Sequence, residues 1–314
     1  VALYVQDSWQ WSKTVELGTG LRYEHDTLAR QGLWSPRLSV AVRPHARWNV
    51  RTTLGLYHTL RNTPMEVQPS RNGRPLRAER ATEVTVGVSG QWAEPLRSGV
   101  TGWAKDFTNL VYEAEPAYYL NGGIGRSHGV ETWLEFAPRR SPLRARLQYA
   151  WSSVRQRDPV AWRRQWSEDA STGERVWGPL FEEPYWYSPL QDQRHRFGLE
   201  TRLRAGAWEF GAHLQLASGL PYTPVESLQS DDEGNVSGIV GRKGSARLPD
   251  YARLDLRAER SFQGSSLRWR VYAEILNVTA ANNVYMTRWN RAYTQQYSVT
   301  MLPFLPTLGV EASF

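Results

Sequence analysis

Apolar and polar residues alternate along this chain with a period of two. The clearest case is the segment 305–314, in which every second residue from Leu308 to Phe314 is apolar and the residues between them are polar or small. Successive side chains of a β-strand point to opposite faces, so the pattern predicts a strand with one apolar and one polar face. A strand between hydrocarbon and a watery lumen needs these two faces, although a strand of a soluble core can show the same pattern.

The same alternation recurs along the whole chain, which predicts an all-β fold. About fourteen candidate strands follow one another, at residues 1–9, 15–24, 37–43, 48–56, 83–88, around Trp103, 130–136, 143–151, 197–204, 208–216, 252–259, 267–275, near Val284, and 305–314. Most are near the roughly ten residues that a tilted strand needs to cross a bilayer. Charged residues such as Glu83 and Arg202 stand in the middle of the polar faces. We therefore expect an antiparallel transmembrane β-barrel whose polar faces line the lumen.

The connections between the candidate strands are short or long. Short ones are expected at 44–47, 138–142 and 205–206, and long ones at 61–80, 109–128, 154–194 and 219–250. Short turns at one end and long loops at the other are typical of outer-membrane barrels. Counting strands back from Phe314 puts the 219–250 loop at the short-turn end unless a strand near 297–302 is missed. The sequence therefore leaves open which side the loops after Gly219 face.

Composition narrows the function. No apolar run approaches the length of a spanning helix, whereas fifteen Trp and fifteen Tyr suit the interfaces of a membrane protein. A Trp-rich sugar-binding protein or sandwich is the soluble alternative. The net charge is +7, but the arginines are scattered among acids, so we expect no nucleic-acid partner. The absence of cysteine excludes disulfides and thiolate sites.

Motifs of catalysis and of metal binding are missing. The six histidines form no H-E-x-x-H and no i, i+4 pair, and no G-x-S-x-G elbow marks a nucleophilic serine. We expect no metal site, no cofactor and no enzymatic activity. The long 154–194 segment combines aromatic residues with arginines, a composition that can stack a sugar or an aromatic ligand. The candidate ligand contacts are Trp162, Trp166, Trp177, Tyr185 and Trp186, although packing of these rings against one another explains the composition equally well.

Several segments together resemble the C-terminal barrel half of TonB-dependent outer-membrane receptors, particularly those with a carboxypeptidase-regulatory-like front. In chain order they are Y-V-Q-D-S-W at 4–9, G-L-R-Y at 20–23, W-S-P-R-L at 34–38, N-G-G-I-G-R-S-H-G-V-E at 121–131, Q-R-H-R-F at 193–197, S-G-L-P-Y-T-P at 218–224, R-L-P-D-Y-A-R-L-D at 247–255, I-L-N-V-T-A-A-N-N at 275–283 and P-T-L-G-V-E-A-S-F at 306–314. No one of these segments is diagnostic, but their order covers the whole chain. The terminal Phe314 is similar to the signal that the barrel-assembly machinery reads.

The resemblance implies a 22-stranded barrel with an N-terminal plug, located in the outer membrane of a Gram-negative bacterium. Its implied partners are outer-membrane lipid and lipopolysaccharide, the barrel-assembly machinery, an extracellular ligand that the sequence does not identify, and TonB through the plug. The chain has no plug and about eight strands too few, so residues 1–314 are expected to be the C-terminal portion of such a receptor. Two alternatives stay open: a self-closing, porin-like channel of about fourteen strands, and an outer-membrane hydrolase that brings a serine, a histidine and a carboxylate together at the lumen mouth.

Overall fold

The computed structural model describes residues 1–27, 31–59, 76–115, 118–168, 175–230, 234, 236–264, 267–290 and 293–313, with side-chain positions for all of these except 163–168 and 175–177. Every regular element among these residues is a β-strand, as the alternation predicts. None of the described residues forms a helix that is long and apolar enough to span a membrane. Phe314 lies outside the described residues.

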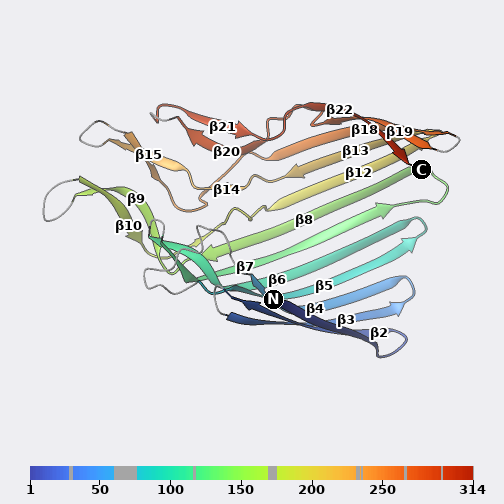
Figure 1. Ribbon diagram of the computed structural model, residues 1–314, viewed down its shortest axis with the longest axis horizontal. Helices are drawn as coiled ribbons and strands as arrows, with labels where there is room; N and C mark the ends of the chain where they lie inside the picture. The colour runs from blue at the N-terminus through green and yellow to red at the C-terminus, as the bar shows by residue number, and fades with distance from the viewer. Residues whose placement is uncertain are drawn as a thin grey trace.

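One antiparallel sheet of fourteen strands makes up most of the molecule (Figure 1). In spatial order it contains β1 (Ala2–Gln10), β2 (Val15–Asp26), β3 (Gln31–His45), β4 (Trp48–Thr59), β5 (Glu79–Ala93), β6 (Leu96–Glu115), β7 (Tyr118–Phe136), β8 (Leu143–Arg157), β12 (His195–Ala205), β13 (Trp208–Ala217), β18 (Tyr251–Gln263), β19 (Arg268–Leu276) and β22 (Leu305–Ser313), with the short β11 (Trp186–Tyr187) beside the end of β8. Each long strand pairs with the next long strand along the chain. This meander is the simplest way to satisfy backbone groups by antiparallel pairing.

The remaining strands form small two-stranded sheets within the long connections. They are β9 (Ala161–Glu168) with β10 (Arg175–Glu182), β14 (Pro221–Tyr222) with β17 (Ala246–Arg247), β15 (Val225–Ser230) with β16 (Val236–Val240), and β20 (Val284–Trp289) with β21 (Gln296–Thr300). The expected 154–194 and 219–250 loops therefore carry secondary structure of their own.

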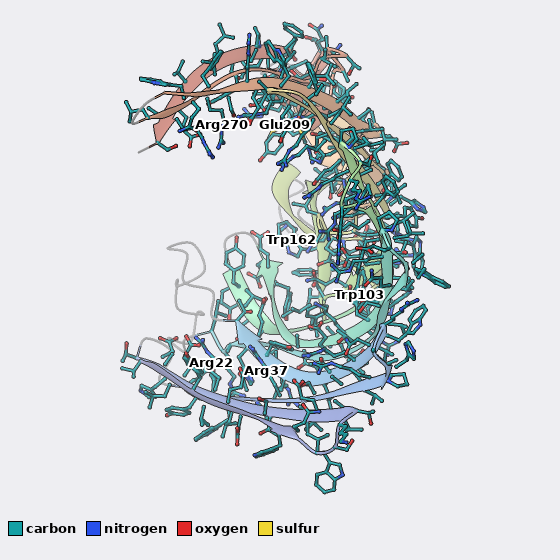
Figure 2. All side chains as sticks on the ribbon, turned by 90° about the vertical axis from the view of Figure 1, so that its right-hand side faces the viewer. Arg22, Arg37, Trp103, Trp162, Glu209 and Arg270 are labelled. Carbon is teal, nitrogen blue, oxygen red and sulfur yellow. The ribbon has the colours of Figure 1, made fainter. Side chains whose placement is uncertain are left out.

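The large sheet curves into a wall with a concave and a convex side, and β1 and β22 form its two edges (Figure 2). Arg37, Trp103, Glu209 and Arg270 point to the concave side. A single row across five strands shows the opposite face: Leu134, Leu147, Leu199, Leu214 and Leu254 stand directly opposite one another in register. The convex face is apolar and the concave face is charged, as the alternation predicts.

The strand order shows at which end of the sheet the connections after Gly219 lie. The segment near Val284, counted among the candidate strands, lies in the β20–β21 hairpin outside the large sheet, and β19 pairs directly with β22. The 219–250 connection therefore lies at the same end as the 158–194 connection, and the short turns 46–47, 94–95, 137–142 and 206–207 lie at the other end (Figure 1). The fourteenth strand of the sheet is β11 instead.

The expected long loop at 109–128 is wrong. β6 and β7 are twenty and nineteen residues long and are joined by residues 116–117 alone. The glycines of N-G-G-I-G hid the strand, because a glycine has no side chain that could show the alternation. Gly122 has φ +140°, a conformation that favours glycine.

Aromatic side chains border the apolar face at both ends. Near the short turns the convex face carries Trp9, Trp48, Trp92, Trp208, Phe262 and Trp269. Near the long connections the convex face carries Tyr23 and Trp34, whose ring centres are 4.6 Å apart, and Trp151, whose ring lies beside that of His128. Along β12, from Ala205 opposite Trp208 to His195 opposite Trp151, ten residues of a strand tilted by about 40° rise roughly 26 Å, close to the apolar band of outer-membrane barrels.

Candidate functional site

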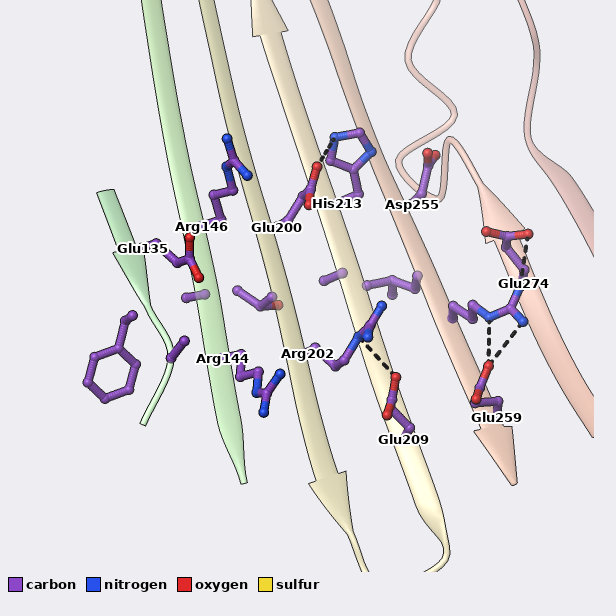
Figure 3. A pocket seen from close by; sticks show the side chains of 18 residues that line it. Glu135, Arg144, Arg146, Glu200, Arg202, Glu209, His213, Asp255, Glu259 and Glu274 are labelled. Carbon is purple, nitrogen blue, oxygen red and sulfur yellow. Dashed lines mark hydrogen bonds and ion pairs between the residues drawn. The ribbon is translucent and has the colours of Figure 1, made fainter. Parts of the chain in front are cut away.

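Charged side chains form rows across the concave face. In one row Glu135, Arg146, Glu200, His213 and Asp255 stand directly opposite their neighbours, so that acids alternate with basic side chains. Opposite charges in such cross-strand pairs contribute about 0.2–1 kcal/mol each. The five side chains of this row border a hollow of about 470 Å³ on the concave side (Figure 3).

A network of ion pairs follows nearer the short turns. Arg257 lies 3.0 Å from Glu259 and 3.8 Å from Glu274, and its guanidinium stands 3.9 Å from the centre of the Tyr272 ring. Arg270 joins Glu259 at 3.6 Å to Glu311 at 3.3 Å. This part of the wall is polar without carrying a large excess of either charge.

A second hollow of about 650 Å³ lies on the concave side of β4 to β8, nearer the long connections. Its lining includes Trp103, Glu131 and the ion pair of Lys105 with Glu83, which are 3.1 Å apart. The concave wall therefore offers mixed polar and aromatic contacts along its length.

Asp192 holds the long connections to the sheet. Its side chain is fully buried and accepts hydrogen bonds from the backbone N–H of Val154 at 2.7 Å, from Arg194 Nε at 2.9 Å and from Arg247 Nη2. Arg247 Nη1 also donates to the carbonyl oxygens of Asp192 and Gly219. Burial works to raise the pKa of Asp192, but these hydrogen bonds outweigh it and hold the pKa below its usual value.

Asp158 joins the same elements a few residues away. Its buried carboxylate accepts hydrogen bonds from Lys243 Nζ at 2.9 Å, from the Tyr187 hydroxyl at 3.0 Å and from Gln156 Nε2 at 3.3 Å. Gly244, with φ +62°, packs so closely on the carbonyl oxygen of Ser188 that a Cβ there would clash with it. The 242–247 segment is thereby fixed against β11 and β8.

These contacts enclose a hollow of about 420 Å³, which we name the basic–aromatic hollow. It is lined by Arg155, Tyr185, Trp186, Tyr187, Ser188, Arg194, Arg242, Lys243, Gly244, Ser245 and Arg247. Five of these residues are cations, and the two carboxylates that hold three of them, Asp158 and Asp192, are buried behind the lining. The arrangement suits an anion that carries a flat or conjugated group.

The structure brings two of the five predicted ligand contacts to this hollow. The ring of Tyr185 lies 5.1 Å from the Arg242 guanidinium, and that of Trp186 lies 5.6 Å from the Arg126 guanidinium. Trp162 is instead held by a hydrogen bond of its Nε1 to the Glu113 carbonyl oxygen at 2.8 Å. Trp166 and Trp177 are paired in the backbone of the β9–β10 hairpin, and their side chains lie outside the described part.

Sequence reasoning missed the basic side of the hollow. Arg194, Arg247 and Asp192 come from segments far apart in the sequence and meet only in the fold. Arg194 and Arg247 do fall within two family-like segments, Q-R-H-R-F and R-L-P-D-Y-A-R-L-D. This was the one signal in the sequence that could have found them.

In the described part of the chain, no histidine that contacts a serine is also joined to a carboxylate by a hydrogen bond or ion pair. Ser35 Oγ lies 3.1 Å from His58 Nδ1, so a serine and a histidine do meet. The residue directly opposite His58 in the sheet is Arg80, a cation. His195 Nδ1 contacts the Tyr149 hydroxyl at 2.8 Å. Among the residues that the structure describes, no three histidine or acidic side chains are grouped to hold a metal ion.

The family model "TonB dependent receptor-like, beta-barrel" matches residues 1–278. No curated protein sequence matches the chain.

Solved structures share the fold. The chain is similar to the ferric-catecholate import receptor Fiu of E. coli K12 (TM-score 0.61, 13% identity), covering 99% of this chain and 44% of Fiu. It is also similar to the siderophore receptor PiuA of Acinetobacter baumannii, with a TM-score of 0.64 and 12% identity over 98% of this chain and 42% of PiuA. The ferripyoverdine receptor of the Pseudomonas aeruginosa outer membrane matches with a TM-score of 0.61 and 11% identity over 98% of this chain and 38% of that receptor. The chain therefore spans less than half the length of these receptors.

Proposed function

The chain belongs to the TonB-dependent receptor-like β-barrel family, and from that premise we propose that it forms part of the wall of an outer-membrane receptor that imports a ligand with energy passed through TonB. The observation that carries the proposal is the two-faced sheet: an apolar convex face with aromatic borders, and a charged concave face on strands long enough to cross a bilayer. In this arrangement the convex face contacts outer-membrane lipid and lipopolysaccharide, and the long connections face the outside of a Gram-negative cell.

We propose that residues 1–314 are the C-terminal portion of the receptor. β1 and β22 are the free edges of an open sheet, and unpaired backbone groups are untenable in lipid. Further strands and a plug outside this chain would complete the barrel and carry the contact with TonB. Phe314 would serve as the signal for the barrel-assembly machinery.

The open edges argue against a self-closing channel of fourteen strands. Such a channel needs β1 and β22 to pair, whereas the two strands end the sheet at opposite sides of its opening (Figure 2). A catalytic role has less support, because no hydrogen bond or ion pair joins His58, the histidine that contacts Ser35, to a carboxylate among the described residues.

The ligand would first meet the long-connection end of the wall. We place its contacts at Tyr185 and Trp186 in the basic–aromatic hollow, and at Trp162, Trp166 and Trp177 in or beside the β9–β10 hairpin. The excess of cations in the hollow favours an anionic ligand.

Uptake by iron-limited cells tests this function. The probes are radiolabelled ferric citrate and a ferric catecholate, two anionic chelates. Deletion of the receptor gene and deletion of the TonB gene should abolish the same uptake, and Trp186→Ala should reduce it while leaving the receptor in the outer membrane. Uptake of either probe through this receptor that persists without TonB would contradict energised transport.

A further inference from the structure

A cluster of arginines lies at the opposite end of the wall from the basic–aromatic hollow. The turn between β7 and β8, the start of β8 and the end of β12 enclose a hollow of about 280 Å³. It is lined by Arg139, Arg140, Ser141, Pro142, Arg144, Arg202 and Arg204, and we name its five arginines the arginine cluster. Every charged residue in this lining is a cation.

The acids around the cluster do not balance it. Glu94 pairs with Arg139 at 2.5 Å, and Glu209 is shared by Arg202 at 3.0 Å and Arg204 at 2.7 Å. Five guanidinium groups thus face two carboxylates. Among the described residues, no carboxylate pairs with Arg140 or Arg144, so the hollow carries an excess of positive charge.

The register of the sheet also places two of these positive charges directly opposite each other. Arg144 stands directly opposite Arg202, and like charges in directly opposed positions destabilise a sheet. Arg146, two residues further along the same face of β8, stands between Glu135 and Glu200 instead. Figure 3 shows the contrast: the row through Arg146 alternates in sign, whereas Arg144 and Arg202 lie next to each other. An anion between the two guanidinium groups would remove the repulsion.

We propose that the arginine cluster binds a phosphate group. The guanidinium fork matches the oxygens of phosphate, and several forks around one small hollow suit a compact anion with more than one negative charge. Ser141 adds a neutral donor, because its Oγ accepts the backbone N–H of Leu143 at 3.2 Å and its own O–H stays free to donate. The side chains of Arg139, Arg202 and Arg204 are all more than half exposed, so the site is open to a ligand from the watery side. The phosphate can be a free ion or the headgroup of a lipid.

Titration with inorganic phosphate tests the site. The complete receptor that contains this chain is held in an uncharged, phosphate-free detergent, and binding is followed by calorimetry at constant ionic strength. Arg144→Gln and Arg140→Gln each remove a charged donor, so each should weaken phosphate binding about tenfold. Arg146→Gln is the matched control, on the same strand and the same face, and should bind phosphate as the unchanged chain does.

Thermal unfolding supplies the second readout. Without phosphate, Arg144→Gln should unfold at the same or a higher temperature than the unchanged chain, because one of the two opposed charges is gone. With phosphate, the unchanged chain and Arg146→Gln should gain stability and Arg144→Gln should gain little. This readout also shows that each variant folds.

A lipid arm identifies the source of the phosphate group. Lysophosphatidic acid added to the micelles should displace inorganic phosphate if a headgroup occupies the site, and failure to displace it would assign the site to the free ion. Either result supports a phosphate site. No measurable binding of inorganic phosphate, equal weakening by Arg144→Gln and Arg146→Gln, or equal stabilisation by chloride would overturn the proposal.

Discussion

Asp192 shows how one residue holds the outer end of the wall. Its carboxylate is fully buried between Arg194 and Arg247 and also accepts the Val154 N–H. A buried charge is tolerated only when it is paired and hydrogen-bonded. The three contacts connect the end of β8, the start of β12 and the 219–250 connection, so the basic–aromatic hollow depends on a group that does not line it.

Replacing Asp192 by Asn should loosen these connections. The amide keeps the shape but loses the charge, so two arginines lose their counter-ion, at a cost of roughly 2–3 kcal/mol. The measurement is the free energy of unfolding together with proteolysis of the 219–250 segment. Asp106→Asn is the control, because Asp106 and Arg126 form a pair that is mostly exposed and should be nearly neutral. Equal effects of the two variants would mean that burial of Asp192 is unimportant.

The same carboxylate sets a pH dependence. The pKa of Asp192 is lower in the folded chain than in the unfolded chain, where it is about 3.9. Its contribution to stability is therefore complete above the unfolded pKa and is lost as the pH falls through the folded pKa. Proteolysis of the 219–250 segment should stay slow at pH 5 and become faster only below about pH 4, where Asp192→Asn should show no such change. Acceleration already between pH 7 and pH 5 would contradict this assignment.

At the scale of the strand, adjacent residues meet different surroundings. Leu214 lies in the apolar row between Leu199 and Leu254, whereas its neighbour Gln215 lies on the concave face and contacts His213. Leu214→Arg should cost about 2–4 kcal/mol if the position lies near the middle of the bilayer, and Gln215→Arg should be mild. Reversible unfolding in phospholipid vesicles measures both. Similar costs would show that the two faces are misassigned.

The long connections should all be reached from one side of the membrane. The chain has no cysteine, so a single introduced thiol reports its own position. Ser227→Cys in β15 and Ser298→Cys in β21 should react with a membrane-impermeant maleimide on intact cells. Ser141→Cys, in a short turn, should react only after the cells are opened. Labelling of Ser227→Cys only in opened cells would restore the strand count that the sequence suggested, in which the 219–250 connection lies at the short-turn end.

The strands could be predicted from sequence because alternation is a local property. The alternation assigns Leu214 and Gln215 to opposite faces even when the neighbouring strands are not known. The count after Gly219 failed because the 284–300 hairpin alternates like a sheet strand, and local pattern does not state which strand pairs with which. The basic–aromatic hollow escaped for the same reason: Tyr185 and Arg247 are 62 residues apart, and only the fold brings them to one hollow.

At the scale of the whole molecule, the open edges and the two different faces are both features of a barrel wall. Leu308 and Val310 of β22 are 85% and 64% exposed at one edge, and all of β1 is exposed at the other. A curved sheet with an apolar outside and a charged inside is the shape of a barrel wall, and such a wall is stable in lipid only when its edges are paired. The two faces, the aromatic borders and the free edges all support the proposal that the chain is part of a larger barrel.

The most direct test of this account is a scan of nitroxide spin labels along β13 in outer membranes that contain the receptor. Labels at 212, 214 and 216 should collide with oxygen, which concentrates in the hydrocarbon, and labels at 211, 213 and 215 should collide with a water-soluble nickel complex. This two-residue period would show that the convex face meets acyl chains while the concave face meets water. Collision rates that do not alternate along the strand would contradict the account.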